Sequence, residues 1–360
     1  MSDTAEEAKQ VRKTRSRRST QAGVKLEDVA RLAKVSTATA SRVINAPSTV
    51  TEKTRRRVEA AIAELGWIPH GAAQALASQR TRTIGALIPT LGHQTIATML
   101  ESLQQALGSG GYTLLLGRPD ASEARTLDQA AKMVQNGVEC LVIMGEDHPQ
   151  ELFTMLEQRK VLHVIVYTTG AFGRTNCIGI DNYDEMSNMV RYLIDLGHRS
   201  FGVIAANYAH NDRIRLRING IQDTLAKEGI AVRPQHFKIV PQWTIGCGRE
   251  GMRAIIEEPM RPTAVICTND YLASGAVIEA KAQGLSVPSD ISISGFDDIE
   301  LARHVDPPLT TVDVPSREMG QVIANYVMNV LDGEEIALPI RVNAQLVIRS
   351  STGAPRTTDI

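Results

Sequence analysis

Cysteine is scarce in this sequence, and its spacing excludes two common kinds of site. The 360 residues include four cysteines, Cys140, Cys177, Cys247 and Cys267, with neither metal-ligand nor redox spacing. The eight histidines are scattered, with no pair at the spacing of ligands on one helix. The sequence therefore predicts reduced thiols, no metal site and no cofactor.

Long apolar runs and enzyme motifs are also missing. No stretch is long enough to span a bilayer, and the N-terminus lacks the apolar segment of a signal peptide. We therefore expect a cytoplasmic protein without membrane contact. No Gly-x-Gly-x-x-Gly follows a strand, and there is no Walker loop or nucleophile elbow. The sequence predicts no catalytic residues, and His198, between a helix and a strand, is expected to be structural.

Charge is distributed unevenly along the chain. Residues 1–60 contain fourteen Lys or Arg and seven Asp or Glu, a formal charge of +7, so the total of −1 leaves −8 for the remainder. A basic N-terminal segment on an acidic body is typical of a nucleic-acid-binding module. Residues 1–23 have no large apolar cluster and are expected to form a disordered basic tail.

The next segment has the pattern of a helix-turn-helix. One apolar stripe predicts a short helix, and a second helix is expected from about Thr37, with Ser36 as its N-cap. Only a tight turn fits between them, as DNA-binding helix pairs require. A third helix is expected from Thr51 to Gly66. The three apolar stripes are Leu26, Val29, Ala30 and Ala33; Ala40, Val43 and Ile44; and Val58, Ala61, Ile62 and Leu65.

Residues 24–77 resemble the DNA-binding headpiece of the lactose and galactose repressor family. One departure is Lys34, where the family usually carries glycine; a left-handed backbone there costs a non-glycine residue roughly 1 to 2 kcal/mol. The matching residues are Asp28-Val29-Ala30, Val35-Ser36, Thr39, Ser41-Arg42-Val43, Thr54-Arg55, Ile68-Pro69, Ala73-Gln74 and Leu76-Ala77.

The resemblance implies a headpiece at residues 24–69 and a hinge helix with linker at 70–81. We expect Thr37 and Ala38 to read bases and Arg42 to reach a guanine edge or a phosphate. Leu76 is expected to enter the minor groove as an apolar wedge. The full set of expected DNA contacts is Ser36, Thr37, Ala38, Thr39, Ser41, Arg42, Asn45, Ala73 and Leu76.

Beyond residue 82, apolar strand-like runs alternate with amphipathic segments. This alternation predicts a parallel sheet covered on both faces, a doubly wound α/β body. The expected strands are 83–90, 112–116, 140–144, 161–167, 201–206, 263–268 and 291–296, and helices are expected at 96–107, 127–135, 186–196, 214–228 and 272–283.

The family core is similar to periplasmic sugar receptors, which implies two α/β subdomains with a cleft between them. We expect an N-subdomain at about 82–181 and 314–342 and a C-subdomain at about 182–313 and 343–352. The connections between them are placed near Asn182, Asp313 and Val342. The sequence ends without the leucine heptads that make tetramers, so a homodimer on a near-palindromic operator is expected.

In open α/β sheets, ligands bind beyond the carboxyl ends of the strands. By resemblance, Arg217, Asn269 and Asp297 hold the effector, Trp243 supplies an aromatic wall, and Thr90 is a weaker candidate in the first cleft loop. Their chemistry suits vicinal hydroxyl groups. Asp270 and Asp298 are expected to cap helices. Arg213 and Arg215 either favour an acidic sugar or are exposed helix charges.

These patterns predict a repressor of genes for carbohydrate or sugar-acid metabolism, whose operator binding is controlled by a small sugar-like effector. A nucleoside or purine corepressor remains the alternative within this class. An enzyme or a solute receptor on the same α/β core is the alternative outside it.

Overall fold

The computed structural model describes residues 24–68, 75, 80–118 and 123–356. They belong to two compact units, residues 1–81 and residues 82–360. The expected basic tail and most of the expected hinge, with Ala73 and Leu76, lie outside the described residues. No helix in the described part of the chain is long and apolar enough to cross a membrane.

The N-terminal unit contains the expected helix-turn-helix. Helices α2 (Leu26–Leu32), α3 (Thr37–Asn45) and α4 (Glu52–Leu65) follow one another, with the 3₁₀ turn η1 (Pro47–Thr49) between the last two. Ser36 caps α3 by accepting a hydrogen bond from the Thr39 amide at 3.1 Å. Gly66 ends α4 with φ of 59°. Seven of the eleven predicted core residues are buried together, and Leu26, Ile62 and Leu65 are partly buried against them, whereas Ile44 is not part of this cluster. The buried residues are Val29, Ala30, Ala33, Ala40, Val43, Val58 and Ala61.

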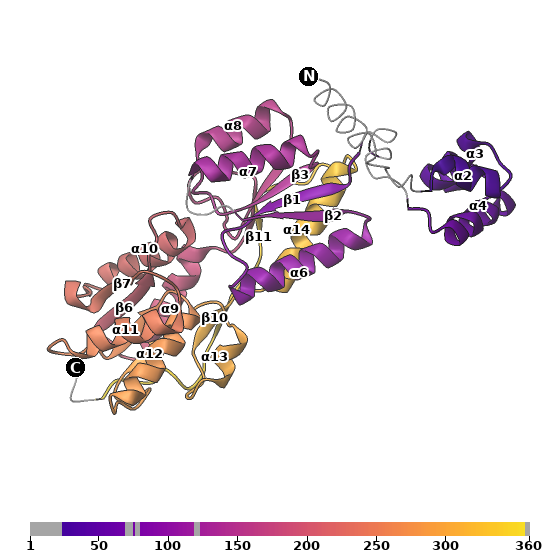
Figure 1. The fold of residues 1–360 in the computed structure, drawn as a ribbon. Helices are drawn as coiled ribbons and strands as arrows, with labels where there is room; N and C mark the ends of the chain where they lie inside the picture. The colour runs from indigo at the N-terminus through magenta and orange to yellow at the C-terminus, as the bar shows by residue number, and fades with distance from the viewer. Residues whose placement is uncertain (1–23, 69–74, 76–79, 119–122, 357–360) are drawn as a thin grey trace, which may run out of the picture. The chain divides into compact units, whose positions relative to one another are not determined.

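The N-subdomain is built on a parallel sheet in the order β11-β5-β4-β3-β1-β2. Helices α6 (Gln94–Ser109) and α14 (Ser316–Leu331) cover one face, and α7 (Glu123–Gln135) and α8 (Gln150–Gln158) cover the other (Figure 1). The strands are β1 (Thr83–Leu87), β2 (Thr113–Gly117), β3 (Cys140–Met144), β4 (Leu162–Val166), β5 (Cys177–Gly179) and β11 (Ile340–Arg341).

The C-subdomain repeats this architecture on a smaller parallel sheet in the order β7-β6-β8-β9. Helices α9 (Asn182–Asp195) and α10 (Asp212–Lys227) pack on one face, and α11 (Ile245–Ile256) and α12 (Asp270–Ala282) on the other. The strands are β6 (Phe201–Ala206), β7 (Phe237–Val240), β8 (Ala264–Cys267) and β9 (Ser292–Ser294), with η2 (Pro234–His236) before β7 and α13 (Glu300–His304) after β9. The predicted fold class, a headpiece plus a doubly wound α/β core, is confirmed.

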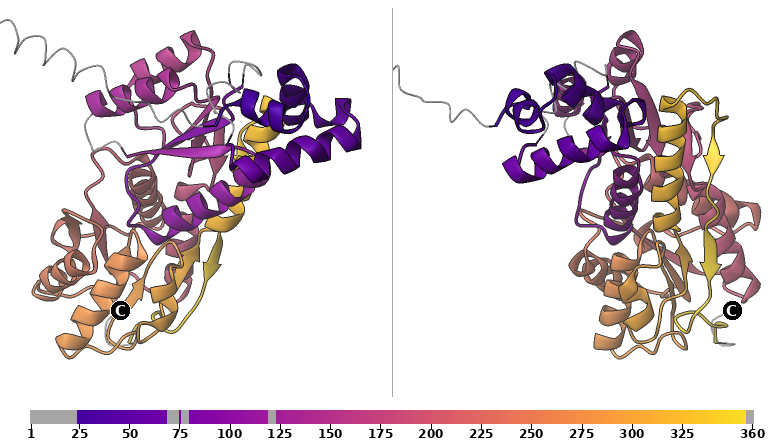
Figure 2. Two further views of the ribbon diagram at one scale, coloured as in Figure 1. Left: turned by 45° about the vertical axis from the view of Figure 1, so that its right-hand side comes forward. Right: turned by 90° about the vertical axis from the view of Figure 1, so that its right-hand side faces the viewer.

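Three connections join the two subdomains. The chain passes from β5 to α9, from β10 (Thr311–Asp313) to α14, and from β11 to β12 (Gln345–Val347). Strands β10 and β12 pair antiparallel. Figure 2 shows the C-terminal strands, in yellow, running from one subdomain to the other beside α14. The carboxyl ends of both parallel sheets therefore lie close to the region where the subdomains meet.

The seven expected strands are all present, but β5, β7, β10, β11 and β12 were not among them. β5 has only three residues, too few to show a pattern. β7 is an edge strand whose Ile239 is exposed, so it has no continuous apolar run. Both strands complete a sheet that the longer strands already define.

The buried carboxylate of Glu279 in α12 forms ion pairs with two arginines of α11. The Glu279 side chain is 1% exposed and accepts hydrogen bonds from Arg253 Nε at 2.7 Å and Arg249 Nε at 3.0 Å. The Arg253 hydrogen bond, with that of Gln283, lowers the pKa of Glu279 to about 2. Its stabilising contribution is thus complete above the ordinary carboxyl pKa and is lost as the pH falls toward 2.

We expect Glu279→Gln to lower the free energy of unfolding at pH 7 by about 1 to 3 kcal/mol. The difference from wild type should shrink as the pH falls from 5 to 3, measured by urea denaturation. Glu258→Gln is the control, because Glu258 pairs with Lys238 at a site where its side chain is 32% exposed. Equal losses in the two variants at pH 7 would contradict a special role for Glu279.

Candidate DNA-binding helix and effector cleft

Helix α3 presents an exposed face within the headpiece. Thr37, Ala38 and Arg42 are exposed, and in the described headpiece none of their side chains has a hydrogen-bond partner. Ser36 and Thr39 are instead engaged with each other at the N-cap, with hydroxyl oxygens 2.9 Å apart. Asn45 donates to the Ser41 hydroxyl at 3.2 Å. The exposed side chains of Thr37, Ala38 and Arg42 are therefore free to contact a partner. The other four residues form hydrogen bonds within the helix or at its N-cap.

Arg57, which the sequence did not single out, holds the turn before α3. Lys34 has φ of 52°, so it occupies the left-handed region in which glycine is favoured. Arg57 of α4 donates Nη2 hydrogen bonds to the carbonyl oxygens of Ala33 and of Lys34, the latter at 3.0 Å. Arg57 thus satisfies carbonyl groups that the end of α2 leaves without a helical partner.

In the core, a cavity of about 420 Å³ opens at the carboxyl ends of the strands of both sheets. All five expected effector residues, Thr90, Arg217, Trp243, Asn269 and Asp297, line it. They follow β1, β7, β8 and β9 or lie on α10, so separate elements bring them together. A cavity of this volume is of the size that small ligands fill in protein clefts.

Arg217 is the most completely bonded of these residues. Its Nε donates to Asn182 Oδ1 at 2.9 Å, and Nη1 donates to the Thr268 carbonyl at 2.7 Å. Nη2 lies 3.4 Å from Asp297 Oδ1. The guanidinium also stacks over Phe296, 3.6 Å from the ring centre. Burial lowers the pKa of Arg217, and the charge of Asp297 opposes that shift.

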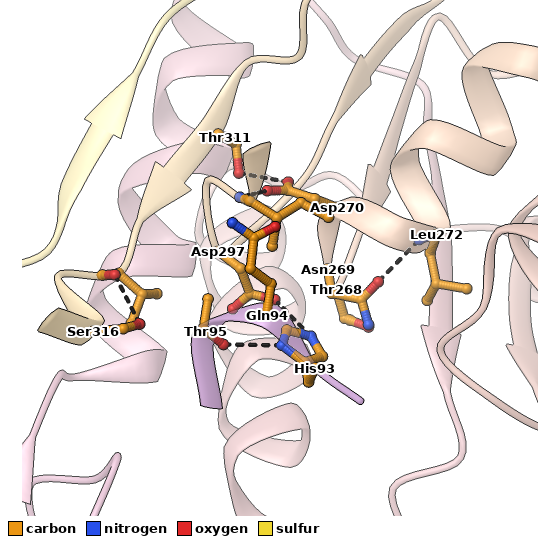
Figure 3. Close-up of polar contacts among 12 residues, drawn as sticks. His93, Gln94, Thr95, Thr268, Asn269, Asp270, Leu272, Asp297, Thr311 and Ser316 are labelled. Atoms are coloured by element: carbon orange, nitrogen blue, oxygen red, sulfur yellow. Dashed lines mark hydrogen bonds and ion pairs between the residues drawn. The ribbon is translucent and has the colours of Figure 1, made fainter. Parts of the chain in front are cut away.

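Asp297 links Arg217 to a residue of the other subdomain. Its Oδ2 lies 3.3 Å from His93 Nε2, and His93 Nδ1 lies 2.9 Å from the Thr95 hydroxyl (Figure 3). Asp297 has φ of 115°, a strained conformation for a residue with a side chain. Strain of this kind is concentrated at functional sites, where surrounding contacts maintain it. The sequence did not identify His93.

The aspartates expected as helix caps are not caps, and this prediction was wrong. Asn269 caps α12, because its Oδ1 accepts from the Leu272 amide at 2.9 Å (Figure 3). Asp270 instead accepts from the Thr311 hydroxyl at 2.6 Å and the Ile299 amide at 3.0 Å. Asp298 pairs with Arg303 and Arg349. The extended backbone at Asn269 makes it the last residue before the helix, so the capping position falls one residue earlier.

An aromatic wall closes one side of the cavity. The His93 and Trp243 ring centres are 5.0 Å apart, and Tyr271 lies 5.3 Å from each of them. Interplanar angles between 54° and 77° place the three rings edge to face or tilted. Trp243 and His93 line the cavity, and Tyr271 packs against both without lining it. The sequence indicated only Trp243.

The two neighbouring arginines of α10 differ in position. Arg213 lines the cavity, whereas Arg215 pairs with Asp147 at 3.1 Å and lies over Phe172. Arg118, which the sequence analysis did not consider, also lines the cavity. His198 is buried and bonded to Thr263, Ser292 and the Gly353 carbonyl, which agrees with a structural role.

A helix-turn-helix headpiece together with a two-subdomain core that encloses a ligand-sized cleft defines the class of ligand-responsive DNA-binding regulators. Family models agree with both parts: bacterial regulatory proteins of the lacI family match residues 25–70, and a periplasmic binding protein-like domain matches residues 190–352. The HTH-type transcriptional repressor PurR of Klebsiella pneumoniae (strain 342) is 33% identical over 330 residues, covering 91% of this chain and 96% of that protein.

Solved structures give the same result. The lac repressor dimer bound to operator and the anti-inducer ONPF superimposes with a TM-score of 0.82 at 28% identity, covering 92% of this chain and 99% of that one. The transcriptional regulator CelR in complex with cellobiose has a TM-score of 0.66 at 25% identity, covering 91% and 99%. The chain belongs to the LacI family, and it is a DNA-binding transcriptional repressor and not an enzyme.

Removing Arg57 tests how the turn before α3 is held. We expect Arg57→Ala to destabilise the headpiece by about 1 to 2 kcal/mol, because the carbonyl groups of Ala33 and Lys34 lose a charged donor. The chain has two tryptophans, Trp67 beside the headpiece core and Trp243 in the cleft. In a Trp243→Phe background, fluorescence during urea denaturation therefore follows the headpiece alone.

The control is Arg56→Ala on the same helix. Arg56 pairs only with the exposed Glu52 among the described residues, so its loss should change headpiece stability by less than about 0.5 kcal/mol. Equal stability of the Arg57 variant and wild type would show that the turn does not need this donor.

Proposed function

We propose that this repressor binds a near-palindromic operator as a homodimer and that a small polyhydroxylated effector, a sugar or a sugar acid, controls its DNA binding from the cleft. The observation that carries the proposal is the convergence of Arg217, Asn269 and Asp297 on one cavity beside Trp243. We propose the same residues as effector contacts, with Thr90 at the cavity edge.

The hydrogen-bonding capacity of these residues suits hydroxyl groups. Asn269 uses its oxygen to cap α12, and its amide nitrogen has no partner among the described residues, so it is a free donor at the cavity. Asp297 supplies acceptors, and each hydroxyl of a sugar both donates and accepts. The indole of Trp243 offers an apolar face to the C–H groups of a sugar ring.

The geometry favours a sugar over a purine. The His93 and Trp243 rings line the cavity side by side, with centres 5.0 Å apart and planes tilted by 60°, so no flat base fits between them. The cellobiose complex of CelR shows that a similar protein holds a sugar. A nucleoside or purine is the second candidate.

A homodimer is supported by an apolar edge of the N-subdomain. Strand β2 is the edge of its sheet, and its Leu115 and Leu116 are 37% and 44% exposed. Exposed apolar edges of this kind favour association with another chain. The similar lac repressor structure is a dimer on its operator. The expected minor-groove wedge at Leu76 stays a prediction.

The operator contacts proposed for α3 can be tested by changing its first two residues. The small side chains of Thr37 and Ala38 favour contact with a thymine methyl group, whereas Thr37→Asn with Ala38→Gln would favour an adenine edge. We expect a randomised-operator selection to return a different half-site, with the salt dependence of binding unchanged because no charge is altered. Arg56→Gln on α4 should keep the wild-type site. An unchanged site for the double variant would refute the assignment.

The role of the cleft can be tested through Asp297. We expect Asp297→Ala to leave operator affinity within about threefold of wild type while raising the effector concentration needed for a response at least tenfold, since a charged hydrogen-bond partner is lost. Fluorescence anisotropy of labelled operator across an effector titration measures both quantities. Asp306→Ala is the control, because Asp306 lies in the same subdomain with its side chain 85% exposed. An undiminished response at unchanged effector concentration would place the regulatory site elsewhere.

A further inference from the structure

The cleft carries an excess of positive charge. Among the described residues that line it, three are arginines, Arg118, Arg213 and Arg217, and one, Asp297, is a carboxylate. Arg217 and Asp297 face each other at 3.4 Å, so their charges largely compensate. Arg213 pairs with the buried Asp212 at 3.0 Å, and Arg118 contacts the uncharged carbonyl of Pro89, so these groups together leave an excess of one positive charge.

Arg213 is held in place by an ion pair that uses only one of its nitrogen atoms. Its side chain is 12% exposed, and Nη1 donates to Asp212 Oδ1 at 3.0 Å. The other oxygen of Asp212 accepts from the Glu146 amide at 2.8 Å, so Asp212 is anchored on the opposite subdomain. Within the described structure, Nε and Nη2 of Arg213 have no partner. Two N–H-bearing nitrogens of a fixed guanidinium are therefore free for a ligand.

The structure makes room for this guanidinium through a glycine. Gly145 has φ of 81°, and a Cβ atom at this position would lie 1.9 Å from Arg213 Nη1 and 2.5 Å from Asp212 Oδ1. A side chain at residue 145 would thus displace the guanidinium. Gly145 leaves room for the Arg213 side chain, and Asp212 holds its guanidinium in place at the cavity wall.

Four helix N-termini add to the positive potential. His93, Asn211, Thr244 and Asn269 are the N-caps of α6, α10, α11 and α12, and all four line the cavity. Each N-terminus acts as roughly half a positive charge. Burial raises the pKa of Asp270, the first residue of α12, well above its ordinary value.

We propose that the effector carries an anionic substituent, a carboxylate or a phosphate ester, which binds Arg213 with support from Arg118. This inference rests on the proposed function of the cleft as the effector site. The anionic group lies beside Arg213 in the first turn of α10, and the hydroxyl groups face Arg217, Asn269 and Asp297. Asp212 is a positioning residue, since it orients Arg213 and ties it to the other subdomain.

The experiment compares matched neutral and anionic sugars by isothermal titration calorimetry on the full chain. The probes are D-glucose with D-glucuronate and D-glucose 6-phosphate, and D-galactose with D-galacturonate and D-galactose 6-phosphate. We expect at least one anionic sugar to bind about 10- to 100-fold tighter than its neutral partner, the range of a charged hydrogen-bond pair. Comparing the affinities of the sugar acids and the sugar phosphates shows whether the cleft prefers a carboxylate or a phosphate ester.

Variants of two arginines on one helix identify the contact. Arg213→Gln should weaken the anionic sugar about 10- to 100-fold and leave the neutral sugar unchanged. Arg215→Gln is the matched control, because Arg215 lies two residues further along α10 and pairs with Asp147 outside the set that lines the cavity; it should keep wild-type affinity. Arg213→Lys retains the charge, and it should keep the preference for the anion at lower affinity, which covers the case that Arg213→Gln does not fold.

The outcomes separate this inference from the proposed function. Tighter binding of the neutral sugars, or an equal loss of neutral and anionic binding in Arg213→Gln, would overturn the anionic site and leave a sugar-binding cleft. Binding of no sugar of either kind would overturn both proposals.

Discussion

A buried guanidinium must find several acceptors, and Arg217 finds them on three separate elements. Asn182 begins α9, the Thr268 carbonyl follows β8, and Asp297 follows β9. Because an unpaired buried charge is costly, these three contacts together favour one relative position of the segments. Asp297 carries the connection on to His93 in the other subdomain. The wall of the proposed effector cavity is thus arranged around one side chain.

The two subdomains meet around the cavity through polar contacts. The Glu146 amide donates to Asp212, Arg215 pairs with Asp147, and the Glu300 amide donates to Gln94. A ligand that contacts both subdomains can favour one arrangement of them over another. The size of this effect is limited to the difference between the ligand's affinities for the two arrangements. This is the physical route by which a small effector in the core can alter the DNA affinity of a repressor.

Local patterns predicted the headpiece and the strand ends well, because helical stripes and apolar runs are local. Asn269 and Asp297 were expected near one cleft because the carboxyl ends of parallel strands meet, but their assignment to the effector, together with Arg217 of α10, came from the family resemblance. His93 was not identified, since its contact with Asp297 joins segments some two hundred residues apart and leaves no local pattern. The capping error at Asp270 and Asp298 arose because the backbone conformation at a strand end, including φ of 47° at Asp298, is set by tertiary contacts.

The central claim is that the cleft and the headpiece share one equilibrium, and reciprocity tests it directly. The affinity of the tightest-binding sugar acid or sugar phosphate should be measured by calorimetry for the free repressor and for the repressor saturated with operator DNA. If the two sites are coupled, the ratio of these affinities must equal the ratio of operator affinities without and with the ligand. We expect a ratio that differs from one by at least about fivefold. A ratio of one would show that the ligand in the cleft does not control DNA binding.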